Sequence, residues 1–412
     1  MSGLGIPSRD FGGPRAGTFG RPKRRRSPLG RVAAKGGLLR QLDWLLIGVT
    51  VGLTVFGTVL VWAATEPILR GAGLNPYSYL QKQVMWVVLG VTLMFVVSAM
   101  DYRRLRAFTP AIYAVALLLL LAVLTPLGAS VNGAKAWIAV PGGFQIEPSE
   151  FAKLALVLST AALLSQHRSR NGRATMADVG MAALAAAPLI ALVEGEPALG
   201  VMLVLVFALA GMVVVSGIRL YWVGGMAAAA AAGIYAVSAL HLLRSYQLTR
   251  LTAFLHPQND LSGAGYNGLQ AKIAVGSGGM YGQGLFRGTF TGGSFVPSVQ
   301  TDFIFTVAGE ELGFVGCAVL ISLIGILIFR AIQVAQRADD MFGMLVATGV
   351  AVWFLFQSFV NIGMTIGIMP ITGLPLPFVS YGGSAILADM IAVGFLQSAR
   401  RHYSLFGTAS HL

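Results

Sequence analysis

Residues 44–64, WLLIGVTVGLTVFGTVLVWAA, decide the class of this protein. These 21 residues contain no charged side chain, and a helix of that length crosses a hydrocarbon core of about 30 Å. Comparable apolar runs recur along the chain, whereas the alternating segments typical of membrane β-barrels do not appear. The sequence therefore predicts an all-α polytopic membrane protein, because helices leave no backbone group unpaired in lipid.

Composition supports the same class. Charged residues make up 11% of the chain, against about 25% in soluble domains, and the mean hydropathy is +0.74. We expect about ten transmembrane helices, with a large extracytoplasmic loop at 244–301 between the seventh and the eighth. The predicted spans are 44–64, 80–99, 108–127, 149–165, 177–194, 197–216, 220–243, 302–330, 343–363 and 381–399.

The net charge of +13 is concentrated at one end of the chain. Ten of the 29 lysines and arginines lie in residues 1–43, among glycine, proline and serine. This pattern predicts a disordered basic tail held at an anionic membrane surface, and not a nucleic-acid-binding segment. With the tail in the cytoplasm, 21 of the 29 cations fall on that side, as the positive-inside rule requires. We therefore expect both termini in the cytoplasm, with a C-terminal tail at 400–412.

Acidic residues in or beside the predicted spans are the first candidates for function, because charge in a membrane is costly. Glu150 and Lys153 are spaced i, i+3 at the head of the fourth span, so they share a helix face. They form either a structural ion pair or part of a polar site. Most of the acids fall in the outer half of the predicted topology, which indicates a polar cavity open to the outside. Further candidates among these acids are Glu194, Glu196, Asp302, Glu310, Glu311 and Asp389.

One further acid, Asp260, lies in the polar stretch HPQNDLSGAGYNG at 256–268. Its nearest cations in sequence are Arg250 and Lys272. From the residues alone, an aspartate beside asparagine, serine and glycine is typical of an Asx-turn. A carboxylate without a tight cationic partner also keeps its basicity, which suits a general base.

The predicted outer loop also carries cations and a glycine-rich run. External cations oppose the usual charge bias, so we expect them to meet an anion, either phospholipid headgroups or a phosphorylated substrate. The run GSGGMYGQG at 276–284 lacks the lysine and hydroxyl of a P-loop. It predicts backbone that turns sharply or approaches a neighbour closely. The cations are Arg244, Arg250, Lys272 and Arg287.

Three long motifs resemble the SEDS family of cell-wall glycosyltransferases. They are NGAKAWIAVPGGFQIEPSEFAK at 132–153, a stretch at 250–316 that includes HPQNDLSGAGYNGLQAKIAVGSGGMYGQG, and NIGMTIGIMPITGLPLPFVSYGGSA at 361–385. The motifs occur in the family order, and the resemblance extends over residues 44–399, the predicted SEDS transmembrane domain. Details of the last two motifs are more similar to the elongation branch of the family than to its division branch.

The resemblance implies polymerisation of lipid II into glycan strands at the outer face of a bacterial cell membrane, during elongation and shape maintenance. The acid of the family motif P-x-x-D-x-x-G-x-G-Y falls on Asp260, which implies a catalytic general base in an inverting transfer. The alternatives are a division polymerase, a lipid II flippase and a scaffold for a synthase. Two departures leave roles unassigned: Ala198 replaces a family aspartate near Glu196, and Ala136 replaces a frequent arginine.

We expect further residues to bind the substrate, its pyrophosphate and the growing chain. No organic cofactor is expected, whereas a divalent cation, Mg²⁺ or Mn²⁺, is a candidate with Asp260 and Glu150 as its ligands. The resemblance implies lipid II, polyprenyl-pyrophosphate-linked glycan and membrane lipid as ligands, and a class B penicillin-binding protein transpeptidase as partner. The predicted substrate-binding residues are Glu150, Lys153, Arg244, Arg250, Lys272, Lys135, Trp137, Asp302, Glu310, Ser380 and Ser384.

Overall fold

The computed structural model describes most of the unit that begins at Leu42. The predicted tail up to residue 40, the candidate residues Arg244 and Asp260, and most of the predicted seventh span lie outside the described residues. The described ranges are 41–131, 134–140, 144–166, 174–219, 221–226, 228, 232, 245–256, 263–293 and 295–406.

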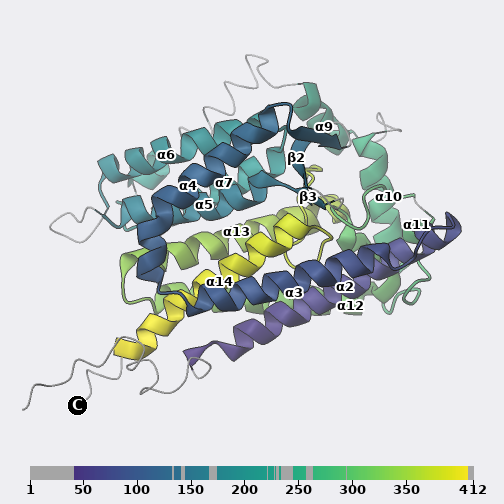
Figure 1. Cartoon of the computed structure of the whole chain (residues 1–412). Helices are drawn as coiled ribbons and strands as arrows, with labels where there is room; N and C mark the ends of the chain where they lie inside the picture. The colour runs from purple at the N-terminus through teal and green to yellow at the C-terminus, as the bar shows by residue number, and fades with distance from the viewer. Residues whose placement is uncertain are drawn as a thin grey trace, which may run out of the picture. The chain divides into compact units, whose positions relative to one another are not determined.

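Long helices running alongside one another form the body of the unit (Figure 1). Three short helices gather at one end of the bundle, on the right in Figure 1. The long helices are α2 (Trp44–Gly71), α3 (Ser78–Ala99), α4 (Tyr102–Leu124), α5 (Pro148–Leu164), α6 (Met176–Gly195), α7 (Leu199–Val215), α12 (Ile304–Gln336), α13 (Met341–Ile366) and α14 (Gly383–Phe406). The short ones are α9 (Ser245–Leu255), α10 (Ala264–Ser277) and α11 (Thr289–Gly292).

Several of these helices meet the requirements of a membrane span. In the described part of the chain, six are long and apolar enough to cross a membrane, namely α2, α3, α4, α6, α12 and α13, and α7 is a shorter apolar helix. Nine of the predicted spans overlap the long helices, and of the seventh only 221–226, 228 and 232 are described, all of them helical. The multi-pass architecture is therefore confirmed, and the count of ten stays a prediction.

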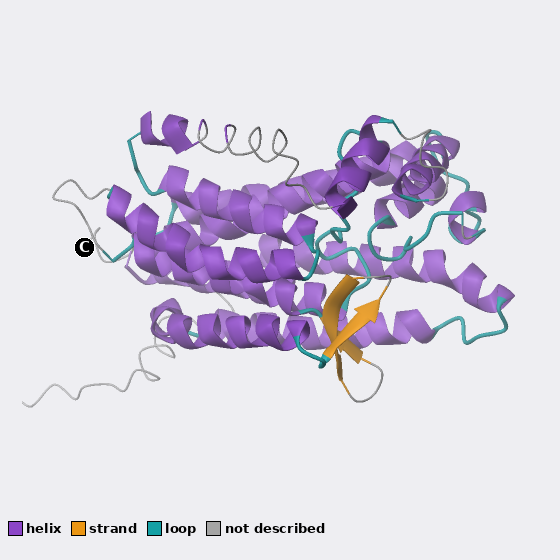
Figure 2. Cartoon of the chain, turned by 90° about the horizontal axis from the view of Figure 1, so that it is seen from above, coloured by secondary structure: helices purple, strands orange, loops and turns teal. Residues whose placement is uncertain are grey.

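One expectation about secondary structure was wrong, and the structure adds detail to two others. The chain is not all-α, because residues 128–146 contain a three-stranded antiparallel sheet, β1 (Gly128–Val131), β2 (Ala134–Val140) and β3 (Phe144–Ile146), beside the helices in Figure 2. The predicted loop at 244–301 contains the three short helices. The predicted tails also reach into ordered structure: Leu42 and Asp43 are buried, and α14 continues through Phe406.

A break in α12 explains the glycine-rich run. Gly313 interrupts the helix with φ of 66° and ψ of −162°. The carbonyls of Glu310 and Glu311 accept from the backbone N–H groups of Gln283 and Gly284, at 2.9 and 3.0 Å. On the other side of the break, the N–H groups at 314 and 315 donate to the carbonyls at 279 and 280, at 2.9 and 3.1 Å. The close backbone approach expected at 276–284 is confirmed.

An irregular segment at 368–382 separates α13 from α14, and its part at 374–380 is mostly buried. Leu374, Leu376 and Phe378 are each no more than 1% exposed. Irregular backbone at this depth needs hydrogen-bond partners from the protein itself. Asn361 of α13 supplies one of them, since its Nδ2 donates to the carbonyl oxygens of Leu374 and Asp302, both at 2.7 Å.

Asp43 joins three helices at the end of the bundle opposite the short helices α9, α10 and α11. It caps α2 by accepting from Leu46 N at 3.2 Å, and its Oδ2 pairs with the guanidinium groups of Arg330 on α12 and Arg400 on α14. Gln397 bonds to both the N–H and the carbonyl of Asp43, at 2.8 and 3.0 Å. Asp43 is 2% exposed, whereas the Arg330 and Arg400 side chains are 18% and 35% exposed. Removal of Asp43 therefore leaves two partly buried guanidinium groups without this partner.

The Asp43→Ala variant should lower stability by about 3–5 kcal/mol, as expected when one partner of a buried charge cluster is lost. The matched control is Asp340→Ala, which removes only the cap bond to Gly343 N and should cost about 1 kcal/mol. Thermal unfolding of the purified proteins in detergent measures both effects. Equal shifts in melting temperature would show that Asp43 acts only as a helix cap.

Candidate functional site

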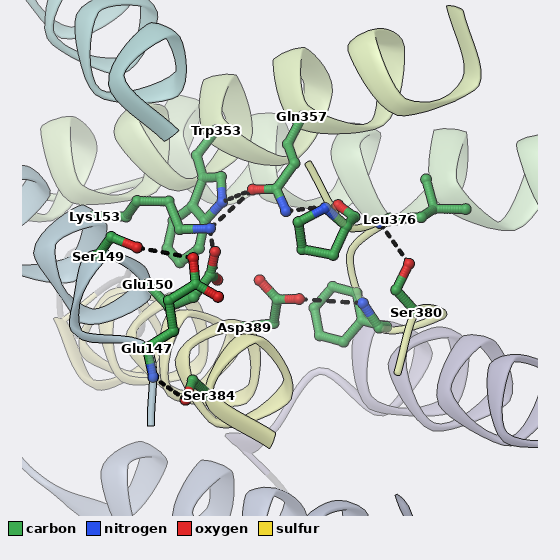
Figure 3. A network of polar contacts seen from close by, with 12 residues as sticks. Glu147, Ser149, Glu150, Lys153, Trp353, Gln357, Leu376, Ser380, Ser384 and Asp389 are labelled. Carbon is green, nitrogen blue, oxygen red and sulfur yellow. Dashed lines mark hydrogen bonds and ion pairs between the residues drawn. The ribbon is translucent and has the colours of Figure 1, made fainter. Parts of the chain in front are cut away.

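Lys153 lies at the centre of a buried polar network between α5, α13 and α14 (Figure 3). Its side chain is 1% exposed, and Nζ donates to Glu150 Oε2 at 2.7 Å and to Gln357 Oε1 at 2.9 Å. Nζ also lies 4.5 Å from the ring centroid of Trp353, where an aromatic face attracts a cation. The shared helix face predicted for Glu150 and Lys153 is confirmed.

Gln357 connects this ion pair to the irregular segment. Its Oε1 also accepts from Trp353 Nε1 at 2.7 Å, and its Nε2 donates to the carbonyl of Pro375 at 2.8 Å. Trp353 and Gln357 are spaced i, i+4 on α13 and are both fully buried. The position of the Lys153 ammonium is therefore coupled to the backbone of the segment before α14.

The helix α14 contributes a carboxyl group and a hydroxyl to the same network (Figure 3). Asp389 is 0% exposed, and its Oδ2 accepts from Phe378 N at 3.1 Å. Ser384 Oγ accepts from Glu147 N at 2.8 Å. Among the described residues, Glu150 Oε1 and Asp389 Oδ1 have no hydrogen-bond partner. Buried oxygens normally find partners, so these two oxygens are suited to accept hydrogen bonds from a further polar group.

Three more carboxyl groups lie in the connections between helices, beside the Lys153 network. Burial and the charge of Glu150 raise the pKa of Glu147 to about 8. Burial and the charge of Glu147 raise the pKa of Glu196 to about 9. Burial raises the pKa of Asp302 to about 6, against the lowering effects of a hydrogen bond from Thr301 and of the Arg250 charge. At neutral pH, Glu147 and Glu196 are therefore mainly protonated, and Asp302 is mainly ionised.

Two predicted cations face a small cavity next to the irregular segment. Arg250 of α9 and Lys272 of α10 both line this space of about 30 Å³, and Arg250 Nη1 donates to the carbonyl of Thr372 at 2.8 Å. Phe254 and Ala264, which flank the undescribed residues 257–262, line the same cavity. The chain thus holds both sides of the Asp260 segment next to two cations.

The structure places the remaining predicted residues elsewhere. Glu310 accepts from the N–H groups of Phe290 and Thr291, at 2.7 and 2.9 Å, and so organises the segment before α12. Lys135 on β2 donates to the carbonyl of Leu124 at 3.2 Å, and Trp137 on the same strand is half-buried. These residues are not among those that contact Lys153, and their roles in substrate binding remain predictions.

Ser380 supports the backbone of the irregular segment. Its Oγ donates to the carbonyl of Thr301 at 2.6 Å and accepts from Leu376 N at 2.7 Å. Tyr381 N adds a bond to the carbonyl of Gln300 at 2.8 Å. These contacts fix the irregular segment to the turn before α12, and substrate contact by Ser380 remains a prediction.

A metal site remains a prediction as well. Within the described ranges, histidine, cysteine, aspartate and glutamate form no group of three or more that is placed to hold a metal ion. Glu150, one of the two predicted ligands, instead pairs with Lys153. Asp260, the other, lies outside the described residues.

Sequence reasoning missed Trp353 and Gln357 as members of the network. A usable signal exists, because Trp353, Gln357 and Asn361 recur every four residues in an apolar helix. Such spacing places the three polar or amphipathic side chains on one face. Polar residues within a span mark interior positions. Glu147 was quoted only as part of a motif, and its bond to Ser384 joins segments 237 residues apart.

Comparison with known proteins shows similarity along almost the whole described unit. The FtsW/RodA/SpoVE family model, described as "Cell cycle protein", matches residues 43–405. A probable peptidoglycan glycosyltransferase FtsW of Trichlorobacter lovleyi is 36% identical, over 87% of this chain and 93% of the relative. The peptidoglycan glycosyltransferase MrdB of Escherichia coli K12 is 33% identical, over 88% and 94%. RodA of Treponema pallidum is 33% identical, over 86% and 96%.

Solved structures support the same relationship. A chain from a peptidoglycan synthase complex that coordinates polymerization and crosslinking has a TM-score of 0.72 and 31% identity, covering 88% of this chain and 98% of that one. RodA of Thermus thermophilus has a TM-score of 0.64 and 29% identity, covering 87% and 97%. Relatives from both branches match, so the branch is not decided by these similarities. The chain belongs to the FtsW/RodA/SpoVE family, the SEDS family that its three motifs predicted.

Proposed function

We propose that this chain is a peptidoglycan glycosyltransferase that polymerises lipid II into glycan strands at the outer face of a bacterial cell membrane. The observation that carries the proposal is the buried network around Lys153, which lies between the same helices as two unpaired carboxylate oxygens. Relatives over nearly the full described unit are named peptidoglycan glycosyltransferases. The proposed process is elongation and shape maintenance, with division as the alternative.

Asp260 is the proposed general base. As the acceptor hydroxyl attacks the anomeric carbon of the donor, Asp260 takes its proton, and the bond from that carbon to the pyrophosphate breaks. Direct displacement with one base inverts the anomeric centre and needs no covalent intermediate. Asp260 is expected to be ionised at neutral pH, since the ordinary pKa of an aspartate is about 3.9.

The leaving pyrophosphate is the proposed ligand of the cationic surface formed by Arg250 and Lys272. Both residues line the small cavity whose walls include the flanks of the Asp260 segment. Arg244 precedes α9 in the sequence and is a third candidate. Cations held in place beside a leaving phosphate stabilise the charge that develops on it.

The Lys153 network is the proposed site for polar groups of a sugar. An ammonium group has three donors, and Glu150 and Gln357 accept two from Lys153. The third donor and the unpaired oxygens of Glu150 and Asp389 provide one donor and two acceptors for sugar hydroxyls. Ser384 fixes the start of α5 through Glu147 N and so positions this set.

A transpeptidase of the class B penicillin-binding protein type is the proposed partner. The related peptidoglycan synthase complex couples polymerization with crosslinking, which supports an assembly of this kind. A lipid II flippase is the competing function. It is separable by assay, because a flippase moves labelled lipid II across vesicles without making polymer.

The Asp260→Asn variant should abolish polymer formation, because an amide does not accept the proton of the acceptor hydroxyl. Purified protein given fluorescent lipid II, with products separated on a gel, measures the effect. The matched control is Asp339→Asn, a change at an exposed aspartate that should leave polymer yield unchanged. Equal polymer from wild type and Asp260→Asn would refute the general-base assignment.

Glu150 and Lys153 can be tested as a pair. Glu150→Gln and Lys153→Met should each destabilise the protein by about 3–5 kcal/mol, because each leaves a buried charge without its partner. The double variant should recover most of the melting temperature but stay inactive in polymerisation. The control pair is Glu66 and Arg70, 2.5 Å apart with Arg70 71% exposed, whose double replacement should change little. Recovery of polymerisation in the Glu150/Lys153 double variant would assign that pair a purely structural role.

The raised pKa of Asp302 predicts that polymerisation activity decreases on the acidic side of its pH profile. When ionised, it attracts Arg250 and holds it toward the pyrophosphate, so polymerisation should fall as pH drops through about 6, where the folded protein protonates Asp302. Asp302→Asn should show low activity without this step. The free energy of unfolding should change in the opposite direction to activity, and decrease as pH rises. Because the folded pKa lies above the ordinary value of 3.8, wild type loses stability between these two pH values as pH rises.

The melting temperature of Asp302→Asn should therefore exceed that of wild type at pH 7.5 and converge with it near pH 4. Melting curves across this range, recorded with the pH–rate profiles, measure both parts. If Asp302→Asn loses polymerisation activity near pH 6 as wild type does, another group is responsible for that loss.

A further inference from the structure

A second pocket lies between α4, α5 and α6, at the opposite end of α5 from the Glu147 cap. Its volume is about 520 Å³, within the range of small-molecule sites. We call it the α4–α6 pocket and define it by Arg106, Tyr113, Ser159, Gln166 and Ala185. Ala162, also in its wall, is nine residues beyond Lys153, about 13 Å along the helix. The pocket is thus separate from the Lys153 network.

The described residues of the pocket's inner wall offer no free hydroxyl proton to a ligand. The hydroxyl groups of Thr109 and Ser159 donate to carbonyls of their own helices, both at 3.1 Å. Tyr113 Oη donates to the carbonyl of Ala185 at 2.7 Å. Pro110 and Leu163 complete the wall. Because these hydroxyl protons are already bonded within the protein, this part of the pocket is suited to a hydrocarbon chain.

The polar residues of the pocket lie at one end. Arg106 is in the second turn of α4, and Gln166 follows the end of α5. The Arg106 guanidinium lies 5.8 Å from the ring centroid of Phe342. In the described part of the chain it has neither an ion pair nor a hydrogen bond to a side chain. A partly buried guanidinium of this kind favours an anionic ligand.

Nearby acids are engaged with other groups. Asp178 accepts from Thr175 N at 2.8 Å in the capping box of α6. Asp101 interacts electrostatically with Arg401. Arg106 is the charged residue among the described residues that line the pocket. The pocket therefore complements an anion.

The surroundings of the pocket match a lipid bilayer. Phe108 of α4 is 55% exposed and Leu184 of α6 is 74% exposed, and both helices are candidate spans. The start of α4 lies at the end of the bundle where α14 finishes, because Ser398 Oγ and Arg401 Nη2 bond to the carbonyls of Met100 and Ala99. In the predicted topology this end faces the cytoplasm, where anionic lipid headgroups attract cations.

We propose that the α4–α6 pocket binds one anionic phospholipid of the cytoplasmic leaflet, with its phosphate at Arg106 and Gln166 and an acyl chain along Tyr113 and Ala185. The site needs both halves, a cation at the mouth and an apolar wall. It does not depend on the glycosyltransferase activity proposed above, since its ligand is a membrane component and not the substrate.

The full-length protein in phosphatidylcholine vesicles, with a trace of spin-labelled phosphatidylglycerol or spin-labelled phosphatidylcholine, tests the site by electron spin resonance. Wild type should immobilise phosphatidylglycerol in preference to phosphatidylcholine. Arg106→Gln should reduce this preference about fivefold, the effect of one basic side chain near an anionic lipid. The control Arg104→Gln changes an exposed arginine two residues away and should have little effect.

A second pair of variants tests the apolar wall without changing charge. Ala185→Phe fills the pocket and should lower the preference as much as Arg106→Gln does. Ala183→Phe, at an exposed position on the same helix, should not. Melting temperatures near wild type show that the variants are folded. Equal immobilisation of both lipids, or an equal loss in Arg104→Gln, would overturn the proposal. A preference that survives Ala185→Phe would mean headgroup attraction at the surface and would overturn the pocket as the site.

Discussion

A lysine ammonium that is 1% exposed imposes the strongest constraint on this structure. A buried charge is tolerated only when it is paired and its donors are bonded. Lys153 meets this requirement with Glu150 from its own helix and with Gln357 and Trp353 from α13. Since Gln357 also bonds to the carbonyl of Pro375, satisfying one charge fixes the relative positions of two helices and the irregular segment. The network around this charge is the rigid frame on which the proposed sugar site is built.

A second constraint comes from backbone that leaves the helical ladder within an apolar protein. At Gly313 the freed carbonyl and N–H groups bond to the glycine-rich run at 279–284. In the irregular segment before α14, side chains provide the hydrogen bonds to the backbone. They belong to Asn361, Gln357 and Ser380. Polar residues in the family motifs therefore serve two purposes, and those whose bonds go mainly to backbone support the architecture that positions the chemistry.

Features that depend on one short segment could be predicted from the sequence, whereas features that depend on contacts between distant residues could not. The run at 44–64 specifies a span because its length and apolarity are contained within itself, and Glu150 with Lys153 specifies a pair because both lie within one helical turn. Asp43 was assigned to a basic tail because its side-chain partner Arg330 is 287 residues away, and Gln397, which bonds to its backbone, is 354 residues away. The sheet at 128–146 was missed because two of its strands have only four and three residues, too short for a clear alternation of polar and apolar positions.

The break at Gly313 also has a mechanical consequence. A continuous helix of 33 residues would transmit a tilt from one end to the other, but the hydrogen-bond ladder of α12 is interrupted at this position. Four backbone bonds instead fasten the helix on both sides of the interruption to residues 279–284. The turn after α10 is therefore fastened to α12 on both sides of Gly313. A displacement of α10 would act on the middle of α12, at the break, and on both of its parts together.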